Sequence, residues 1–326
     1  MDGISKIGVL LILGGIVFIS GCVEGTGLES IFSTFTTQQE VVVAPNEVLE
    51  IEDVKVIPNP PITADSSFKI VMSVVNVGEA SEGVKEAREV KTHVYDYGMC
   101  KPQSDTSIDH GTVYPGGGTA LAEFNFKSPS NKELGYMQGK CTIRYAVEFK
   151  YDAYTTSDVV IISREKAEEL SRTGETLEIN PVQTRSRGPI KIDVNFDVAQ
   201  PVYEDLVIPM IIKVRNVGEG TFNTLTNPPG LIVELPQQLE VISCSPDRWA
   251  KVHHGGTDTI EIPVSGEEVP LINKETPPIR CDLRVKDGVT VSDILTLTVR
   301  AKLMGYKYTI YGEKPVQIKP TYEGGG

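Results

Sequence analysis

The chain has 326 residues and a formal net charge of −13 at pH 7, from 44 acidic and 31 basic side chains. This length allows two domains that each bury a core of their own. The acidic balance, which no basic stripe offsets, argues against nucleic acid as a partner, because like charges repel. We interpret the acidity as a means of keeping an exposed protein soluble.

Residues 1–21 have the pattern of a secretory signal with a lipid-attachment site. Lys6 is followed by residues 7–19, each of which is either apolar or glycine. As a helix this run measures about 20 Å, shorter than the ~30 Å hydrocarbon core of a bilayer and therefore typical of a signal. Residues 19–22, Ile-Ser-Gly-Cys, resemble the lipobox of prokaryotic lipoproteins. The resemblance implies cleavage before Cys22 and a lipid on its thiol.

Two alternatives for the N-terminus stay open. An uncleaved anchor would stretch residues 4–23 across the membrane, and a pilin-type signal would be cleaved near Gly8 and keep its apolar helix. In each case residues 22–40, which are rich in Gly, Ser, Thr and Gln, are predicted to form a flexible tether.

A similar stretch occurs twice in the rest of the chain. Residues 68–79 and 208–219 both alternate between apolar and polar side chains, and both end in Asn-Val-Gly-Glu. Their apolar residues have the same parity when counted back from the asparagine, and period-two alternation places such residues on one face of a strand. The repeat therefore predicts two copies of one β-domain.

Each copy of the repeat is predicted to end in a bend. The bends contain Asn76 and Gly78 in the first copy, and Asn216 and Gly218 in the second. An asparagine side chain can bond nearby backbone, and glycine can adopt a positive φ without a Cβ clash.

Further alternating runs predict short strands throughout both halves. In the first half they cover residues 48–56, 68–75, 90–96, 119–126, 141–151 and 155–162, with a turn at 151–154. In the second half they cover residues 190–198, 207–214, 231–235, 239–242, 279–285, 295–303 and 306–318. Between the halves, residues 163–173 predict one helix, with Ser163 as its N-cap and Gly174 as its stop.

Many short strands separated by Gly and Pro turns indicate a sandwich in each half. The predicted fold class is all-β, with two tandem Ig-like antiparallel β-sandwich domains at residues 41–163 and 190–322. A helix and linker at 164–189 join them, and residues 323–326 form a tail. We expect each domain to fold independently.

The repeat also resembles a known family. A strand followed by Val-x-Asn-Val-Gly-Glu, with a proline-rich turn upstream, resembles the Ig-like repeats of archaeal and bacterial surface proteins known as cell-adhesion-related (CARDB-type) domains. The likeness covers residues 48–162 and 190–318. It implies an extracellular β-sandwich and no reaction, and both copies depart from the bare repeat by carrying a cysteine pair.

The five cysteines divide into Cys22 and one pair in each half. We predict the disulfides Cys100–Cys141 and Cys244–Cys281, because an exported protein meets oxidising conditions and Cys141 and Cys281 have the apolar parity of their strands. The alternative is four free core thiols. A zinc site is not expected, because the chain contains no Cys-x-x-Cys.

The sequence contains none of the common catalytic or phosphate-binding motifs, so we expect a protein that is not an enzyme and needs no metal or cofactor. Tyrosines are the other signal, since an exposed aromatic row could bind sugar rings. They are predicted at two matching hairpins, where core packing is the competing interpretation and parity favours it for Tyr145 and Tyr151. The six tyrosines are Tyr145, Tyr151, Tyr154, Tyr306, Tyr308 and Tyr311.

The functional hypothesis is a membrane-anchored extracellular surface protein that acts as a non-catalytic protein-binding or envelope-structural module. Its expected partners are the lipid membrane, through the N-terminus, and other envelope or surface-layer proteins. It would lie at the cell surface, on the extracellular face of the cytoplasmic membrane. The alternatives are a carbohydrate-binding accessory module and a pilin-type filament subunit.

Overall fold

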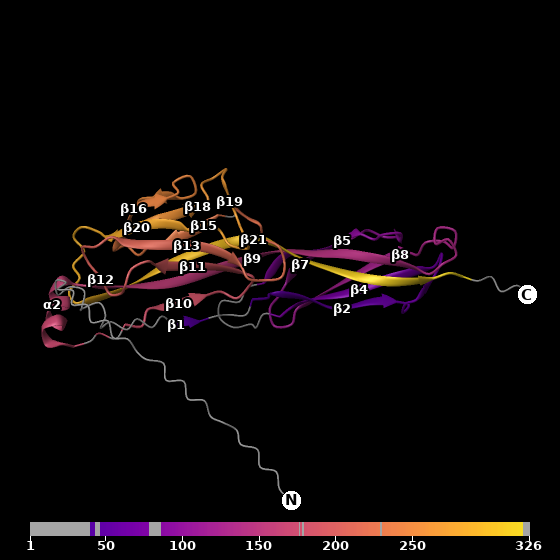
Figure 1. Ribbon diagram of the computed structural model, residues 1–326, viewed down its shortest axis with the longest axis horizontal. Coiled ribbons are helices and arrows are strands. Elements are labelled where there is room, and N and C mark those ends of the chain that lie inside the picture. The colour runs from indigo at the N-terminus through magenta and orange to yellow at the C-terminus, as the bar shows by residue number, and fades with distance from the viewer. Residues whose placement is uncertain are drawn as a thin grey trace, which may run out of the picture. The chain divides into compact units, whose positions relative to one another are not determined.

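The computed structural model describes residues 40–42, 46–77, 86–175, 177, 179–228 and 230–321. The predicted signal, almost all of the tether, Cys22 and Gly78 lie outside the described residues. The described chain is mostly β-strand in several antiparallel sheets, with one helix, which confirms the all-β fold class (Figure 1). All of these residues belong to one compact unit, residues 35–326.

The elements follow one another along the chain in this order. The first half contains β1 (Glu40–Val42), β2 (Leu49–Ile57), β3 (Ile62–Thr63), β4 (Ser67–Asn76), β5 (Ala87–Asp96), β6 (Lys101–Pro102), β7 (Ser107–Val113), β8 (Thr119–Lys127) and β9 (Gly139–Ile162). Next come α2 (Arg164–Thr173), β10 (Val182–Arg185), β11 (Ile190–Phe196), β12 (Val202–Tyr203), β13 (Ile208–Asn216), β14 (Thr224–Thr226) and β15 (Leu231–Glu234). The chain continues through β16 (Leu239–Ser245), β17 (Lys251–His253), β18 (Thr259–Ile262), β19 (Glu268–Pro270), β20 (Ile279–Val285) and β21 (Ile294–Lys319).

Two sandwiches arise from these strands. In the first, the sheet β2-β4-β8-β6 packs against β5, β9 and the end of β21, with β3 paired in parallel to that end. In the second, the sheet β11-β13-β20-β16 packs against β9, β21, β15 and β18, with β12 paired in parallel to the end of β9. Large apolar side chains such as Ile70, Phe124 and Ile143 fill the space between the sheets of the first sandwich.

The two copies of the repeat occupy equivalent places in these sandwiches. Leu49 at the start of β2 lies opposite Asn76, and Ile190 at the start of β11 lies opposite Asn216. The valine after each asparagine donates its backbone N–H to the carbonyl of the residue before the first strand. Val77 donates to Val48 at 3.0 Å, and Val217 donates to Pro189 at 2.8 Å. The two repeats, whose apolar residues have the same parity in the sequence, therefore also pair with their neighbouring strands in the same register.

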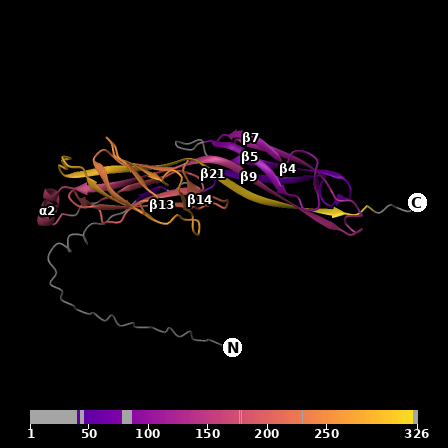
Figure 2. The ribbon, with the colours of Figure 1, turned by 90° about the horizontal axis from the view of Figure 1, so that it is seen from above.

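The two halves nevertheless exchange strands. β9 is continuous over 24 residues and pairs with β21 along almost its whole length. Its first part, from Gly139 to Tyr151, pairs with Tyr306 to Ile318, whereas its second part, from Ala153 to Ile162, pairs with Ile294 to Leu303. Figures 1 and 2 show the two strands side by side, passing together from one sandwich into the other. Each sandwich therefore takes one strand from the other half of the chain.

This exchange corrects the predicted boundaries at 41–163 and 190–322. The turn expected at residues 151–154 does not form, because Tyr-Asp-Ala-Tyr lacks the glycine or proline that a tight turn favours and its two tyrosines favour a strand. β21 also continues from one sandwich to the other without a turn, and its register with β9 shifts at a bulge between Leu303 and Tyr306. Gly305 has φ +67 there, a conformation that residues with a Cβ rarely adopt.

The hydrophobic core of the second sandwich extends across the junction into the near end of the first. One cluster contains Val48, Val74 and Val147 from the first sandwich together with Ile208 and Leu283 from the second. The rest of the first sandwich keeps a separate core, which includes Ile70, Phe124 and Ile143, so the two cores are joined only in part. The junction residues Val147 and Phe149 of β9 belong to the cluster of the second sandwich.

Helix α2 begins and ends where its capping residues predict. The hydroxyl of Ser163 accepts a hydrogen bond from the Lys166 N–H at 3.2 Å, and Gly174 ends the helix in the left-handed conformation. Ala167 and Leu170 are buried against Ile162. The helix thus packs on the second sandwich, and the linker expected after it contains β10, which pairs with β9.

Candidate binding surface on strands β5, β9 and β21

Both predicted disulfides are present in the structure. Cys100 and Cys141 are both buried, and their bond joins the residue before β6 to β9. Cys244 and Cys281 lie directly opposite each other on β16 and β20, with their Cα atoms 4.1 Å apart. The first bond therefore links the two sheets of a sandwich, and the second links neighbours within one sheet.

The repeat-motif bends are structural. Asn76 is buried and donates to the Val113 carbonyl at 3.0 Å. The side chain of Asn216 accepts hydrogen bonds from the Gly218 N–H at 3.1 Å and from the Tyr308 hydroxyl at 3.2 Å. The local asparagine bond is thus confirmed for the second copy.

The expected positive φ at Gly218 is wrong, because its φ lies outside the left-handed region. Close packing, and not the backbone conformation, requires a glycine at position 218. A Cβ at this position would lie 2.5 Å from the Tyr308 hydroxyl oxygen and 2.6 Å from Pro189 Cβ.

The tyrosines do not lie at two hairpins. They lie along the paired strands β9 and β21, where Tyr151 is opposite Tyr306 with the rings 6.2 Å apart in an edge-to-face arrangement. Tyr145 and Tyr308 are also buried, and burial raises the pKa of both hydroxyls. Core packing is therefore correct for these four, whereas Tyr154 is half-buried and Tyr311 is exposed.

The outer face of β5, β9 and β21, on the side away from the core, carries a different set of side chains. Arg88, Lys150 and Lys307 lie in one register row across the three strands. His93, Ala146 and Tyr311 form another row, and Asp96, Arg144 and Glu313 form the last. We call these nine residues and the side chains between them the outer face.

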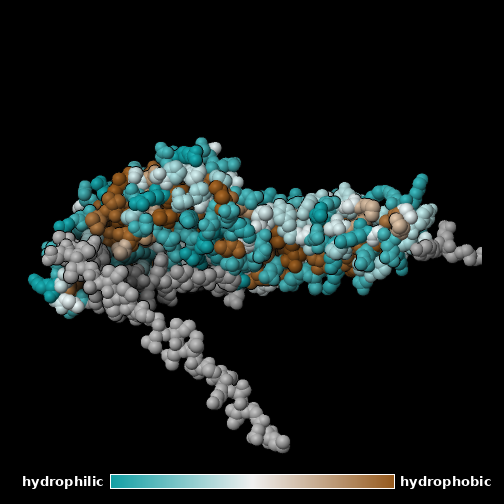
Figure 3. Space-filling view, in the orientation of Figure 1, coloured by the Kyte–Doolittle hydropathy of each residue, from teal (hydrophilic) through white to brown (hydrophobic). Residues whose placement is uncertain are grey.

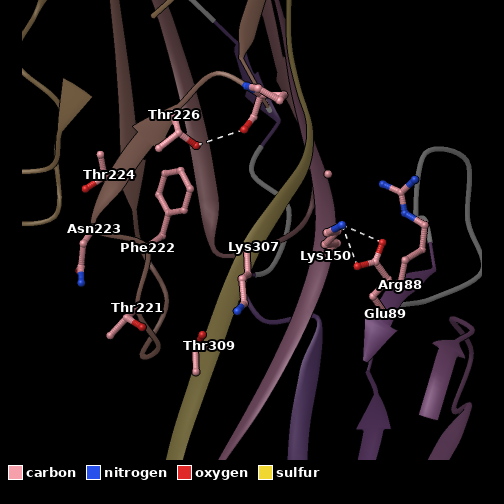
Figure 4. Close-up of a pocket in the computed structure, with 12 residues that line it drawn as sticks. Arg88, Glu89, Lys150, Thr221, Phe222, Asn223, Thr224, Thr226, Lys307 and Thr309 are labelled. Atoms are coloured by element: carbon pink, nitrogen blue, oxygen red, sulfur yellow. Dashed lines mark hydrogen bonds and ion pairs between the residues drawn. The ribbon is translucent and has the colours of Figure 1, made fainter. Parts of the chain in front are cut away.

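A cavity of about 740 Å³ opens at the end of the outer face nearest the second sandwich. Its lining comes from β5, β9 and β21 on one side and from residues 221–228 on the other. In Figure 4, Lys307 and Thr309 lie on β21 between Phe222 and the ion pair of Lys150 with Glu89. The lining is rich in hydroxyl and amide groups, which both donate and accept hydrogen bonds.

The cations of this cavity all have acidic partners. Arg88 contacts Asp152 at 2.5 Å, Lys150 contacts Glu89 at 2.7 Å, and Lys307 contacts Glu148 at 2.7 Å. Asp152 is only 4% exposed and also accepts the Gly305 N–H at 2.6 Å, so it fixes the bulge of β21. The cavity therefore offers hydrogen bonds without a strong net charge.

An exposed aromatic pair lies further along the outer face. Tyr95 and Tyr311 pack edge to face, with centroids 6.0 Å apart, and are 49% and 55% exposed. The ring of His93 lies 6.2 Å from that of Tyr95. Ala146, in the same register row as His93 and Tyr311, is fully buried although its strand position faces outward. The aromatic side chains thus cover a small residue and form a partly exposed platform, in which the two tyrosine rings are perpendicular to each other.

Arg144 borders this aromatic platform. It contacts Asp96 at 2.8 Å and Glu313 at 3.3 Å, from the strands on either side of β9. A guanidinium held between two carboxylates keeps a fixed orientation and leaves further polar atoms at the surface.

Tyr95 is not among the tyrosines that the sequence pattern singles out as candidates. Parity could have found it, because Val90 and Val94 are buried in β5 and Tyr95 is not. The same argument separates Tyr311 from the buried Tyr306 and Tyr308. The missing information was the distance between β5 and β21, which only the sheet order supplies.

Other classes of site have less support in the described part of the chain. No group of three or more His, Cys, Asp and Glu side chains is placed to hold a metal ion among the residues that the structure describes. Within the same residues, no helix has the length and apolarity needed to cross a membrane. The face seen in Figure 3 shows hydrophobic residues in several separate groups, with hydrophilic surface between them.

Comparisons with known proteins do not identify a family. No family model matches the chain, and no curated protein matches it. Among solved structures, the crystal structure of red sea bream transglutaminase matches with a TM-score of 0.18 and 9% sequence identity, over 85% of this chain and 32% of that one. The chain thus spans about a third of the length of that transglutaminase, and a likeness this weak carries no argument about fold or activity.

Proposed function

We propose that this protein is a non-catalytic binding scaffold, tethered by its N-terminus to the extracellular face of the cytoplasmic membrane. The observation that supports this most directly is the strand exchange between the two sandwiches. Tandem domains joined by a linker move relative to each other by default. Here β9 and β21 cross the junction as paired, hydrogen-bonded strands, so no single-chain hinge separates the halves.

The exchanged strands suit a spacer that holds a binding surface away from its anchor. At about 3.3 Å per residue, the 24 residues of β9 extend about 80 Å. A force applied across the junction acts on the ladder between β9 and β21, in which every paired residue shares the load.

Two further features are consistent with the proposed location. Two disulfides are typical of an oxidising, extracytoplasmic compartment. The lipobox-like residues 19–22 would attach the chain through Cys22, and residues 22–40 would then form the tether.

The test is capture of partners from solubilised cell envelope. Residues 40–321 would serve as bait, with the same segment reduced and alkylated as an unfolded control. We expect envelope components to be retained by the folded bait alone, and the native protein to fractionate with membranes. Equal capture by the unfolded control, or a native protein found only in the cytosol, would contradict the proposal.

A further inference from the structure

We propose that the outer face of β5, β9 and β21 binds a neutral polysaccharide chain, with the Tyr95–Tyr311 pair as its stacking platform. This inference rests on the proposed binding function and names the class of its ligand. It is carried by three observations: the exposed aromatic pair, the balanced charge around it, and the polar cavity on the same strand.

The aromatic platform has the chemistry that a sugar ring needs. One side of a pyranose presents mainly C–H groups, which pack on the electron-rich face of an aromatic ring, while its hydroxyls point sideways. About half of each tyrosine side chain is exposed. Asp96, Arg144 and Glu313 lie along the border, where carboxylates accept and the guanidinium donates hydrogen bonds to hydroxyls.

The size of the platform favours a sugar over a folded protein. A tyrosine side chain has roughly 150–250 Å² of surface, so two half-exposed rings present on the order of 200 Å². A stable protein interface buries about 800 Å² on each partner. Because the two rings are perpendicular, one can offer a stacking face to a sugar unit while the other borders it, and together they supply only a small part of a protein interface.

The charge balance favours a neutral ligand. Arg144 is held between two carboxylates, and each cation that lines the cavity also has an acidic partner. An anionic chain would have to displace these pairs, and the net charge of −13 would oppose it. A neutral polyol can bond to the same groups while the ion pairs stay intact.

The cavity extends the site along β21. Lys307, Thr309 and Tyr311 are alternate residues of this strand, so neighbours among them are spaced by roughly 7 Å. Thr221, Thr224 and Thr309 line the cavity, and Thr309 lies one such step from Tyr311. A linear chain stacked on Tyr311 would thus run over Thr309 into the cavity.

The experiment is affinity electrophoresis of residues 40–321 in native gels that contain soluble neutral polysaccharides: β-glucan, mannan, galactan and xylan. The test variant combines Tyr95→Ala with Tyr311→Ala, and the matched control is Tyr136→Ala, an exposed tyrosine in the loop between β8 and β9. We expect at least one polysaccharide to retard the wild type and the control, with affinity at least about tenfold weaker in the double variant. Urea unfolding of each variant confirms that all three are folded.

Two outcomes would overturn the inference. One is equal retardation of the double variant and the wild type by the same polysaccharide, which would place sugar binding elsewhere. The other is no retardation by any of the four. In that second case, continued capture of envelope proteins by the same bait would leave the scaffold function standing, and loss of that capture in the double variant would assign the outer face to a protein partner.

Discussion

Strand exchange predicts that neither half of the chain can fold alone. A fragment of residues 46–163 keeps β9 but lacks the part of β21 from Tyr306 to Ile318, which pairs with β9 and, at its end, with β3 in the first sandwich. Val316 and Ile318 are fully buried in that core, and burial of two aliphatic side chains of this size contributes about 3–6 kcal/mol. The lost ladder adds about a dozen hydrogen bonds, each worth roughly 1 kcal/mol net.

That loss is as large as the whole stability of a typical domain, which is about 5–15 kcal/mol. The fragment of residues 46–163 should therefore show no cooperative urea transition, dispersed amide spectrum or protection of its disulfide from reductant. The complementary fragment of residues 189–321 should fail similarly, because it lacks the part of β9 from Ala153 to Ile162.

A re-linked fragment provides the matched control. Tyr151 and Tyr306 lie opposite each other, so residues 46–151 can be joined to residues 306–321 through a two-residue Asn-Gly hairpin. This chain contains every strand of the first sandwich in its native register and should unfold cooperatively. Cooperative folding of residues 46–163 without that addition, or failure of the re-linked chain alone, would refute the reasoning.

Three other predictions concern single sites. Replacing Cys244 and Cys281 with alanine should lower the free energy of unfolding by about 4 kcal/mol in urea titrations, because the bond closes a loop with a sequence separation of 37; an unchanged midpoint would contradict this. Burial and neighbouring arginines lower the pKa of Lys191 from 10.5 to about 8, so the unfolded chain binds more protons between these values. Stability should then rise with pH from about 8 to about 10.5, by at most ~1.4 kcal/mol per unit, and Lys191→Met should abolish that slope. Intact mass of the membrane-extracted protein should show a lipid on Cys22 as the first residue, which Cys22→Ser removes; an unmodified chain that starts at Met1 would favour the uncleaved anchor.

Local signals in the sequence predicted the local structure well. Cys141 and Cys281 have the apolar parity of their strands, and both are buried and paired as expected. The helix limits followed from Ser163 and Gly174, because capping depends on residues within one turn. These features need no knowledge of which strands become neighbours.

The candidate binding surface depended on knowledge of strand order. Alternation alone places Tyr95 and Tyr311 on outward positions of their strands. Their rings meet because β9 lies between β5 and β21 and contributes a residue as small as Ala146 at the crossing point. Residues more than two hundred positions apart thus form one platform, and period-two patterns contain no information about such a pairing.

The exchange of β9 and β21 escaped prediction for a related reason. The core-facing residues of β9 keep one parity from Cys141 to Ile161, so its apolar pattern fits a continuous strand as well as a hairpin. Those of β21 change parity at the bulge between Leu303 and Tyr306. The short stretch at the junction selects between the hairpin topology and the exchanged topology. A hairpin at both places would give two independent domains, whereas Tyr-Asp-Ala-Tyr at residues 151–154 keeps β9 extended and the bulge at Gly305 lets β21 follow. Asp152 links the continuous β9 to the bulge of β21, since its carboxylate accepts the Gly305 N–H and pairs with Arg88. The polar cavity of the proposed sugar site, which Arg88 and Gly305 line, therefore lies where β9 and β21 pass from one sandwich to the other, and its geometry depends on the strand exchange.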